Sequence, residues 1–234
     1  MRASAMFFSL FFVLLAVYAM VVIKEEKLAD ATVKFALILL VSMVVVSVVR
    51  MDNFAFTMLT VPVLLLTIAA HYGTAAFSSF LSFQMGITQA QGLQSILAHT
   101  MHDIATSSTG KEDPLALTSL ALLNGIAEEA LFTGTAYTIF HRFTRVRYLA
   151  AFITASLFAI YHTQSYFNVS PFFYILNVGK YATNSIVLLS PFVTQLVKCG
   201  LAEQEAKAGG GLLGVTLGHA IGNGLILLAS YGWL

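Results

Sequence analysis

The stretch "NGIAEEALFTG", Asn124 to Gly134, places two adjacent carboxylates, Glu128 and Glu129, inside a long apolar segment. No other charged residue occurs between Asp113 on one side and Arg142 on the other. A run of this length without further charge is typical of a helix that crosses a membrane. The stretch therefore predicts a membrane helix that carries a pair of ionisable groups.

The composition of the whole chain agrees with a polytopic membrane protein. Of 234 residues, 58% are hydrophobic and 10% are charged, and the mean hydropathy is +0.84, whereas ordinary soluble domains are roughly a quarter charged. The apolar run 3–23 exceeds the core of a signal peptide and predicts a retained membrane helix. The single cysteine, Cys199, excludes an internal disulfide. A net charge of +1 without basic runs argues against nucleic acid as a partner.

Hydropathy predicts an all-α bundle of seven or eight transmembrane helices in one integral membrane domain, residues 1–234. A span needs about 20 apolar residues, and the candidate segments are 5–23, 34–50, 54–72, 115–140, 148–166, 171–189 and 211–231. Residues 74–106 mix apolar and polar positions and predict either a further span or an interfacial or buried helix. The polar stretch 198–211 predicts a loop. Residues 1–114 would supply N-terminal spans, and 115–231 the functional core.

The carboxylate pair is costly in lipid. One carboxylate near the bilayer centre costs roughly 2.5 to 3.5 kcal/mol on insertion scales, so Glu128 and Glu129 need protonation or partners. The pair could simply bond neighbouring helices together. Intramembrane charges are more often functional, which favours a site.

Two later segments supply further polar groups at helical spacing. In "FAIYH", Phe158 and His162 are one turn apart, as are His219 and Asn223 in "HAIGN", so each pair shares a helix face. A single buried histidine is more often a packed core residue than a catalyst. Two histidines, an asparagine and the Glu pair on three membrane helices can instead assemble a polar chamber.

The chemistry open to such a chamber follows from its side chains. An ionised glutamate beside a neutral imidazole can take a proton from water, while a second histidine and an amide can donate hydrogen bonds to an oxyanion. This inventory suits peptide-bond hydrolysis without a covalent intermediate. His162, His219 and one glutamate could alternatively hold a metal ion, although the usual His-Glu-x-x-His helix is missing.

The three segments "EEALFTG", "FAIYH" and "HAIGN" resemble, in order, the signatures of the CPBP (Abi) family: Glu-Glu-x-x-x-Arg, Phe-x-x-x-His and His-x-x-x-Asn. These are glutamic intramembrane proteases related to type II CAAX prenyl proteases. The resemblance covers residues 115–231.

The resemblance implies roles for individual positions. Glu128 would activate water as general base, and His162 would hold and polarise that water. His219 and Asn223 would form the oxyanion hole, and Glu129 would be a supporting carboxylate. By resemblance the reaction needs no metal or other cofactor.

One position departs from the family pattern. Thr133 stands where the family has an arginine, which at i, i+4 from Glu129 would neutralise that carboxylate. Glu129 must then be protonated, be paired from another helix, or lie in water. Lys180, the one charged residue of the predicted span 171–189, could pair with Glu129 or could reach a membrane face instead.

Other features concern packing and access. Gly210, Gly214, Gly218 and Gly222 recur every four residues and predict a flat ridge for close helix packing. A small group of polar residues could line a substrate entrance or merely lie at the membrane interface: His71, His99, His102 and Asp103.

Together these features predict a multi-pass intramembrane endopeptidase in the cell membrane, most compatible with a prokaryotic plasma membrane. Its substrate would be a membrane protein or a lipidated peptide, with the lipid bilayer as its surroundings. Two other functions remain open: a catalytically silent scaffold of the same fold, and a small proton-coupled transporter that titrates Glu128 and Glu129.

Overall fold

The computed structural model describes residues 55–85, 114–163, 169–182 and 184–230, with Phe167 and a few positions between 33 and 40. Throughout these residues the regular structure is helical, and they contain no strand. The all-α prediction is therefore confirmed for the described chain. The predicted span 5–23, most of 34–50 and most of 74–106 lie outside the described residues.

The first long helix of the described residues, α3 (Thr60–Gln84), continues well past the predicted end of its span at residue 72. The Thr74 hydroxyl donates to the Ala70 carbonyl at 2.7 Å, so the polar group is satisfied inside the helix. Residues Thr60–Ser78 are long and apolar enough to cross a membrane. The predicted end of the span at residue 72 is therefore too early, because a hydroxyl that bonds back to its own helix does not interrupt it.

The predicted span 171–189 is not one helix. It consists of α9 (Pro171–Leu176), α10 (Val178–Tyr181) and the 3-10 helix η2 (Asn184–Leu188), which lead into α11 (Leu189–Lys207). The Ser170 side chain caps α9 by accepting from the Phe173 N–H, with proline at the first helical position. The apolar stretch long enough to cross a membrane is Ser185–Lys207. The predicted loop 198–211 is therefore mostly helix.

The remaining predicted core spans 115–140, 148–166 and 211–231 are largely helical. They correspond to α5 (Pro114–Glu129), the π-helix η1 (Ala130–Ala136), α6 (Tyr137–Thr144), α7 (Arg147–Tyr161) and α12 (Leu213–Ser230). Arg145 has a φ of 56° and ends α6 in the left-handed conformation. This turn reverses the chain, so α7 packs back against α6.

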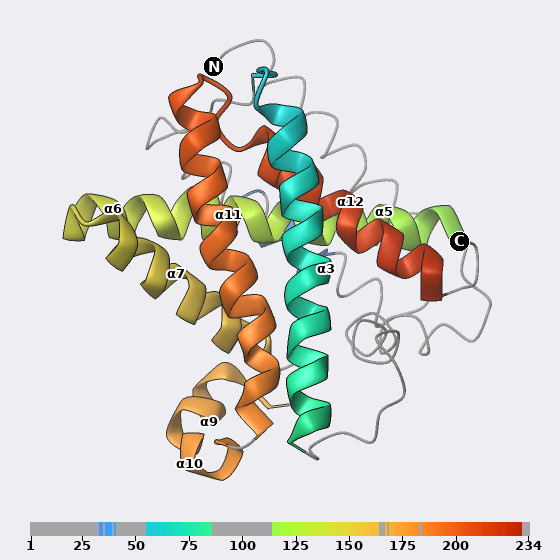
Figure 1. Ribbon diagram of the computed structural model, residues 1–234, viewed down its shortest axis with the longest axis vertical. Helices are drawn as coiled ribbons and strands as arrows, with labels where there is room; N and C mark the ends of the chain where they lie inside the picture. The colour runs from blue at the N-terminus through green and yellow to red at the C-terminus, as the bar shows by residue number, and fades with distance from the viewer. Residues whose placement is uncertain are drawn as a thin grey trace.

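The long helices cross one another near the middle of the molecule (Figure 1). Helix α11 lies beside α3, and two hydrogen bonds show that the helices are antiparallel: Thr60 to Glu205 near the end of α11, and Ser78 to Ile186 of η2, which directly precedes α11. Helix α12 packs against both α3 and α5. The α5–η1–α6 segment crosses α3 and α11 in this view. Four separate helices, α5, α7, α11 and α12, thereby reach one region of the interior.

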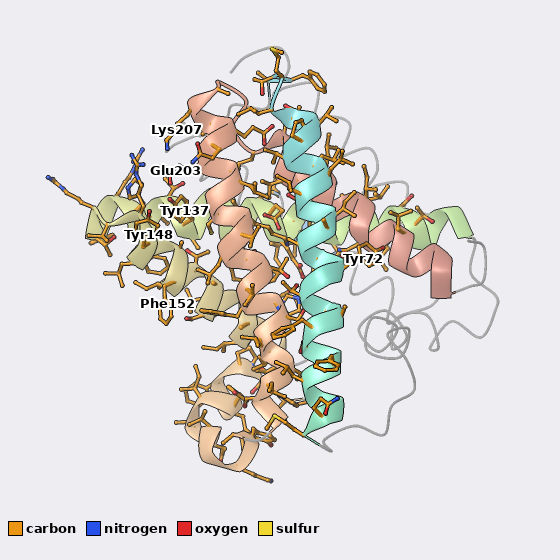
Figure 2. All side chains as sticks on the ribbon, in the orientation of Figure 1. Tyr72, Tyr137, Tyr148, Phe152, Glu203 and Lys207 are labelled. Carbon is orange, nitrogen blue, oxygen red and sulfur yellow. The ribbon has the colours of Figure 1, made fainter. Side chains whose placement is uncertain are left out.

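An ion-pair cluster lies at the C-terminal end of α11 (Figure 2). Glu203 pairs with Arg147 at 2.6 Å and with Lys207 at 3.3 Å, and it accepts from the Tyr137 hydroxyl at 3.3 Å. These charges join the start of α7 to the end of α11. They are partly exposed, so each pair contributes little to stability.

Two glycines of the predicted ridge, Gly214 and Gly218, bring α12 close to the backbone of α3. A Cβ built on Gly214 would lie 2.7 Å from the Thr60 carbonyl oxygen, and one on Gly218 would lie 2.7 Å from that of Leu64. Backbone oxygens cannot move aside as a side-chain tip can. Only glycine lets the two helices approach this closely.

We expect Gly218→Ala to lower the free energy of unfolding by about 1–3 kcal/mol, because the added methyl group overpacks the α3–α12 contact. Thermal unfolding in detergent measures the change. Gly200→Ala is the matched control, since its Cβ would meet nothing within 4 Å. Equal stability of both variants would contradict the packing argument.

Candidate active site

Five residues predicted from the sequence lie on three of these helices or directly at the end of one. Glu128 and Glu129 end α5 immediately before the π-helix, His162 follows the last residue of α7, and His219 and Asn223 lie on α12. All are largely removed from the surface, with Glu129 0% and His219 2% exposed. π-Helical segments often occur at functional sites.

Glu128 lies between the two imidazoles. Its Oε1 is 3.9 Å from His162 Nε2, and its Oε2 is 3.6 Å from His219 Nε2. These separations are longer than a direct hydrogen bond. One carboxylate thus faces two ring nitrogens that come from two other helices.

The orientation of His162 follows from its backbone contact. Its Nδ1 lies 2.8 Å from the Phe158 carbonyl oxygen. A carbonyl oxygen only accepts, so Nδ1 carries the proton, and in the neutral ring Nε2 is an acceptor directed toward Glu128. The Phe158 ring packs on the imidazole with centroids 4.4 Å apart, as the one-turn spacing predicted.

Glu129 is held by partners at both carboxylate oxygens. Its Oε1 lies 2.7 Å from Lys198 Nζ and 2.6 Å from His219 Nδ1, and its Oε2 accepts from the Thr133 hydroxyl at 2.5 Å. Gln195 donates to the same hydroxyl at 2.8 Å. Pairing from another helix, one of three expectations for Glu129, is therefore confirmed.

The partner of Glu129 is Lys198, so the first of the two alternatives for Lys180, pairing with Glu129, is wrong. Lys180 is exposed on α10, with its ammonium 5.7 Å from the ring of Tyr181. Lys198 is fully buried on α11. An apolar run that ends at residue 189 leaves Lys198 in a predicted polar loop, whereas an apolar window extended past Pro191 places it inside a helix.

The other predicted residues have simpler placements. His71 on α3 lies beside the site, with its ring centroid 5.5 Å from that of His219. Asn223 follows His219 by one turn of α12 and is 4% exposed. His99, His102 and Asp103 lie outside the described residues. The described residues contain no group of three or more metal-ligating side chains suited to hold an ion.

Comparison with known proteins identifies a family. No curated protein and no solved structure matches the chain. Residues 111–225 match the family model described as type II CAAX prenyl endopeptidase Rce1-like. This match contains α5, α7, α11 and α12 as far as residue 225, and these helices carry the buried Glu–His–Lys cluster. Through this segment, the chain belongs to the CPBP/CAAX protease family.

Proposed function

We propose that the chain is a multi-pass intramembrane endopeptidase that hydrolyses a peptide bond with a water molecule activated by Glu128. Membership of a protease family supports peptidase activity. The observation that carries the proposal is the Glu128 carboxylate facing His162 Nε2 at 3.9 Å and His219 Nε2 at 3.6 Å. A general base must lie within hydrogen-bond reach of the group whose proton it takes, and because neither separation is a direct hydrogen bond, the Glu128 oxygens are available to a water held beside His162.

In the first step, Glu128 and His162 bind the attacking water. His162 Nε2 accepts one O–H, because Nδ1 already donates to Phe158. Glu128 removes the other proton as the water oxygen bonds to the carbonyl carbon of the substrate. A tetrahedral intermediate forms, and its oxygen carries the negative charge.

In the second step, donors on α12 stabilise that charge. His219 Nε2–H and the Asn223 amide donate hydrogen bonds to the oxyanion. The C–N bond then breaks, and the proton held by Glu128 moves to the leaving amine. Glu128 returns to its ionised form, and no covalent enzyme intermediate is needed.

The substrate is a membrane-associated or lipid-modified protein. The family acts on prenylated proteins, and two described helices are long and apolar enough to cross a membrane. We propose seven or eight spans in the cell membrane, with residues 115–231 as the catalytic core and 1–114 as N-terminal spans. The cleaved bond would lie where the buried Glu128 can reach it from a membrane face.

The direct test compares the termini of membrane-anchored proteins in cells that carry the unaltered protein or Glu128→Ala. A terminus found only with the unaltered protein is expected and would identify the substrate. Matching termini in both cells, with biological function intact in Glu128→Ala and His162→Ala, would indicate a scaffold instead. Solute uptake that depends on pH and is lost in Glu128→Gln would indicate a transporter.

A further inference from the structure

The most unusual buried group outside the predicted set is the Lys198 ammonium. Lys198 is 0% exposed and is among the largest fully buried side chains of the described residues. A buried ammonium is retained only when it is paired and hydrogen-bonded. Its nitrogen lies 2.7 Å from Glu129 Oε1 and 2.9 Å from His219 Nδ1. The buried ammonium of Lys198 is therefore stabilised by two residues of the candidate active site, Glu129 and His219.

Glu129 determines how the two nitrogens share their protons. An ionised carboxylate only accepts hydrogen bonds. Because Glu129 Oε1 is 2.6 Å from His219 Nδ1 and 2.7 Å from Lys198 Nζ, both nitrogens donate to that single oxygen. The short approach of the two nitrogens to each other follows from this shared acceptor.

The arrangement orients His219. With Nδ1 donating to Glu129, the ring cannot rotate without losing a buried charge-assisted bond, so Nε2 stays directed at Glu128, 3.6 Å away. Buried carboxylates elsewhere hold a catalytic imidazole in the same way and stabilise its protonated form. Glu129 can do this only while it is ionised.

Charge balance indicates what keeps Glu129 ionised. The cluster contains two carboxylates, Glu128 and Glu129, and Lys198 is the ammonium bonded to one of them. With His219 protonated, the four groups sum to zero, and His219 Nε2 then carries the proton that an oxyanion needs. Thr133 bonds the other Glu129 oxygen but brings no charge.

We propose that Lys198 is a positioning residue of the active site. From α11, it supplies the positive charge that position 133 lacks, and it keeps Glu129 ionised so that Glu129 orients His219. The role in turnover rests on the proposed protease function. The pairing of Lys198 with Glu129 can be tested without any substrate.

The activity test moves the charge between helices. Lys198→Met, which keeps a similar side-chain length, is expected to lower kcat about 100-fold and to leave KM nearly unchanged. Lys198→Arg should recover part of the loss. In Lys198→Met/Thr133→Arg, an arginine four residues after Glu129 restores the charge, and kcat should rise at least about tenfold above Lys198→Met.

The substrate-free test is a double-mutant cycle on thermal unfolding. Lys198→Met should lower Tm by about 10 °C, because it leaves the Glu129 charge buried without its cation. Lys198→Met/Glu129→Gln removes both charges at nearly constant volume and should recover most of that Tm. Lys180→Met is the control, because Lys180 is exposed and should change neither Tm nor kcat.

Two results would overturn the proposal. One is a folded Lys198→Met protein with kcat within about threefold of the unaltered protein, well short of the loss that a displaced catalytic group causes. The other is a cycle in which the Tm losses of Lys198→Met and Glu129→Gln simply add. If Thr133→Arg prevents folding, the cycle alone decides. Absence of cleavage by the unaltered protein would overturn the proposed function. It would not affect the pairing of Lys198 with Glu129, which the unfolding cycle measures separately.

Discussion

Glu128→Gln is expected to lower kcat for peptide cleavage by about 10³–10⁴-fold, at the upper end of what a general base contributes. Glutamine keeps the size of the side chain but cannot take a proton from water. Among the described residues, the neighbouring carboxylate is Glu129, whose oxygens are already bonded to Lys198, His219 and Thr133. Cleavage of a membrane-anchored peptide by purified protein in lipid vesicles measures the change.

The control for this prediction is Glu203→Gln. Glu203 also lies on a helix of the core, but it pairs with Arg147 and Lys207 at a partly exposed end (Figure 2). The Glu203→Gln variant should be as active as the unaltered protein. If Glu128→Gln kept activity within tenfold while the control behaved as expected, another group would have to be the base.

Glu205→Ala is expected to lower the free energy of unfolding by about 3 kcal/mol, because it leaves buried donors without an acceptor. The Glu205 carboxylate is 0% exposed and accepts from the Gly214 N–H at 2.8 Å and from the Thr60 hydroxyl at 2.9 Å. It joins α3, α11 and the start of α12, where a negative charge also suits the helix dipole.

The sole cysteine allows a direct measurement of the stability lost in Glu205→Ala. Cys199 is buried on α11, so a thiol-reactive fluorophore reports its exposure as the protein unfolds. Glu203→Ala is the matched control two positions earlier on the same helix, and it should cost less than about 1 kcal/mol because its ion pairs are partly exposed. Equal losses for the two variants would contradict the role given to Glu205.

Local spacing predicted the outline of the site. Phe158 and His162 were expected on one face because they are one turn apart, and their rings are in contact. The structure also brings His219 to Glu128 as the chamber hypothesis required. Such predictions succeed because the α-helix converts sequence separation directly into direction.

The error in helix boundaries has a clear cause. Average hydropathy favoured residues 171–189 and ended the span before Lys198. The structure divides that segment into α9, α10 and η2 and places the long helix at Leu189–Lys207. Hydropathy counts each charge as a cost, and it does not register a partner that cancels the charge.

By itself, the sequence determined the helical class, the family motifs and the faces on which their polar groups lie, because these depend on composition and on separations of a few residues. Only the tertiary structure decided how Glu129 is neutralised. Its cation, Lys198, lies 69 positions away in the chain, on a helix that packing brings to the site. Contacts between distant segments depend on how whole helices pack, and no local pattern around Thr133 encodes that packing.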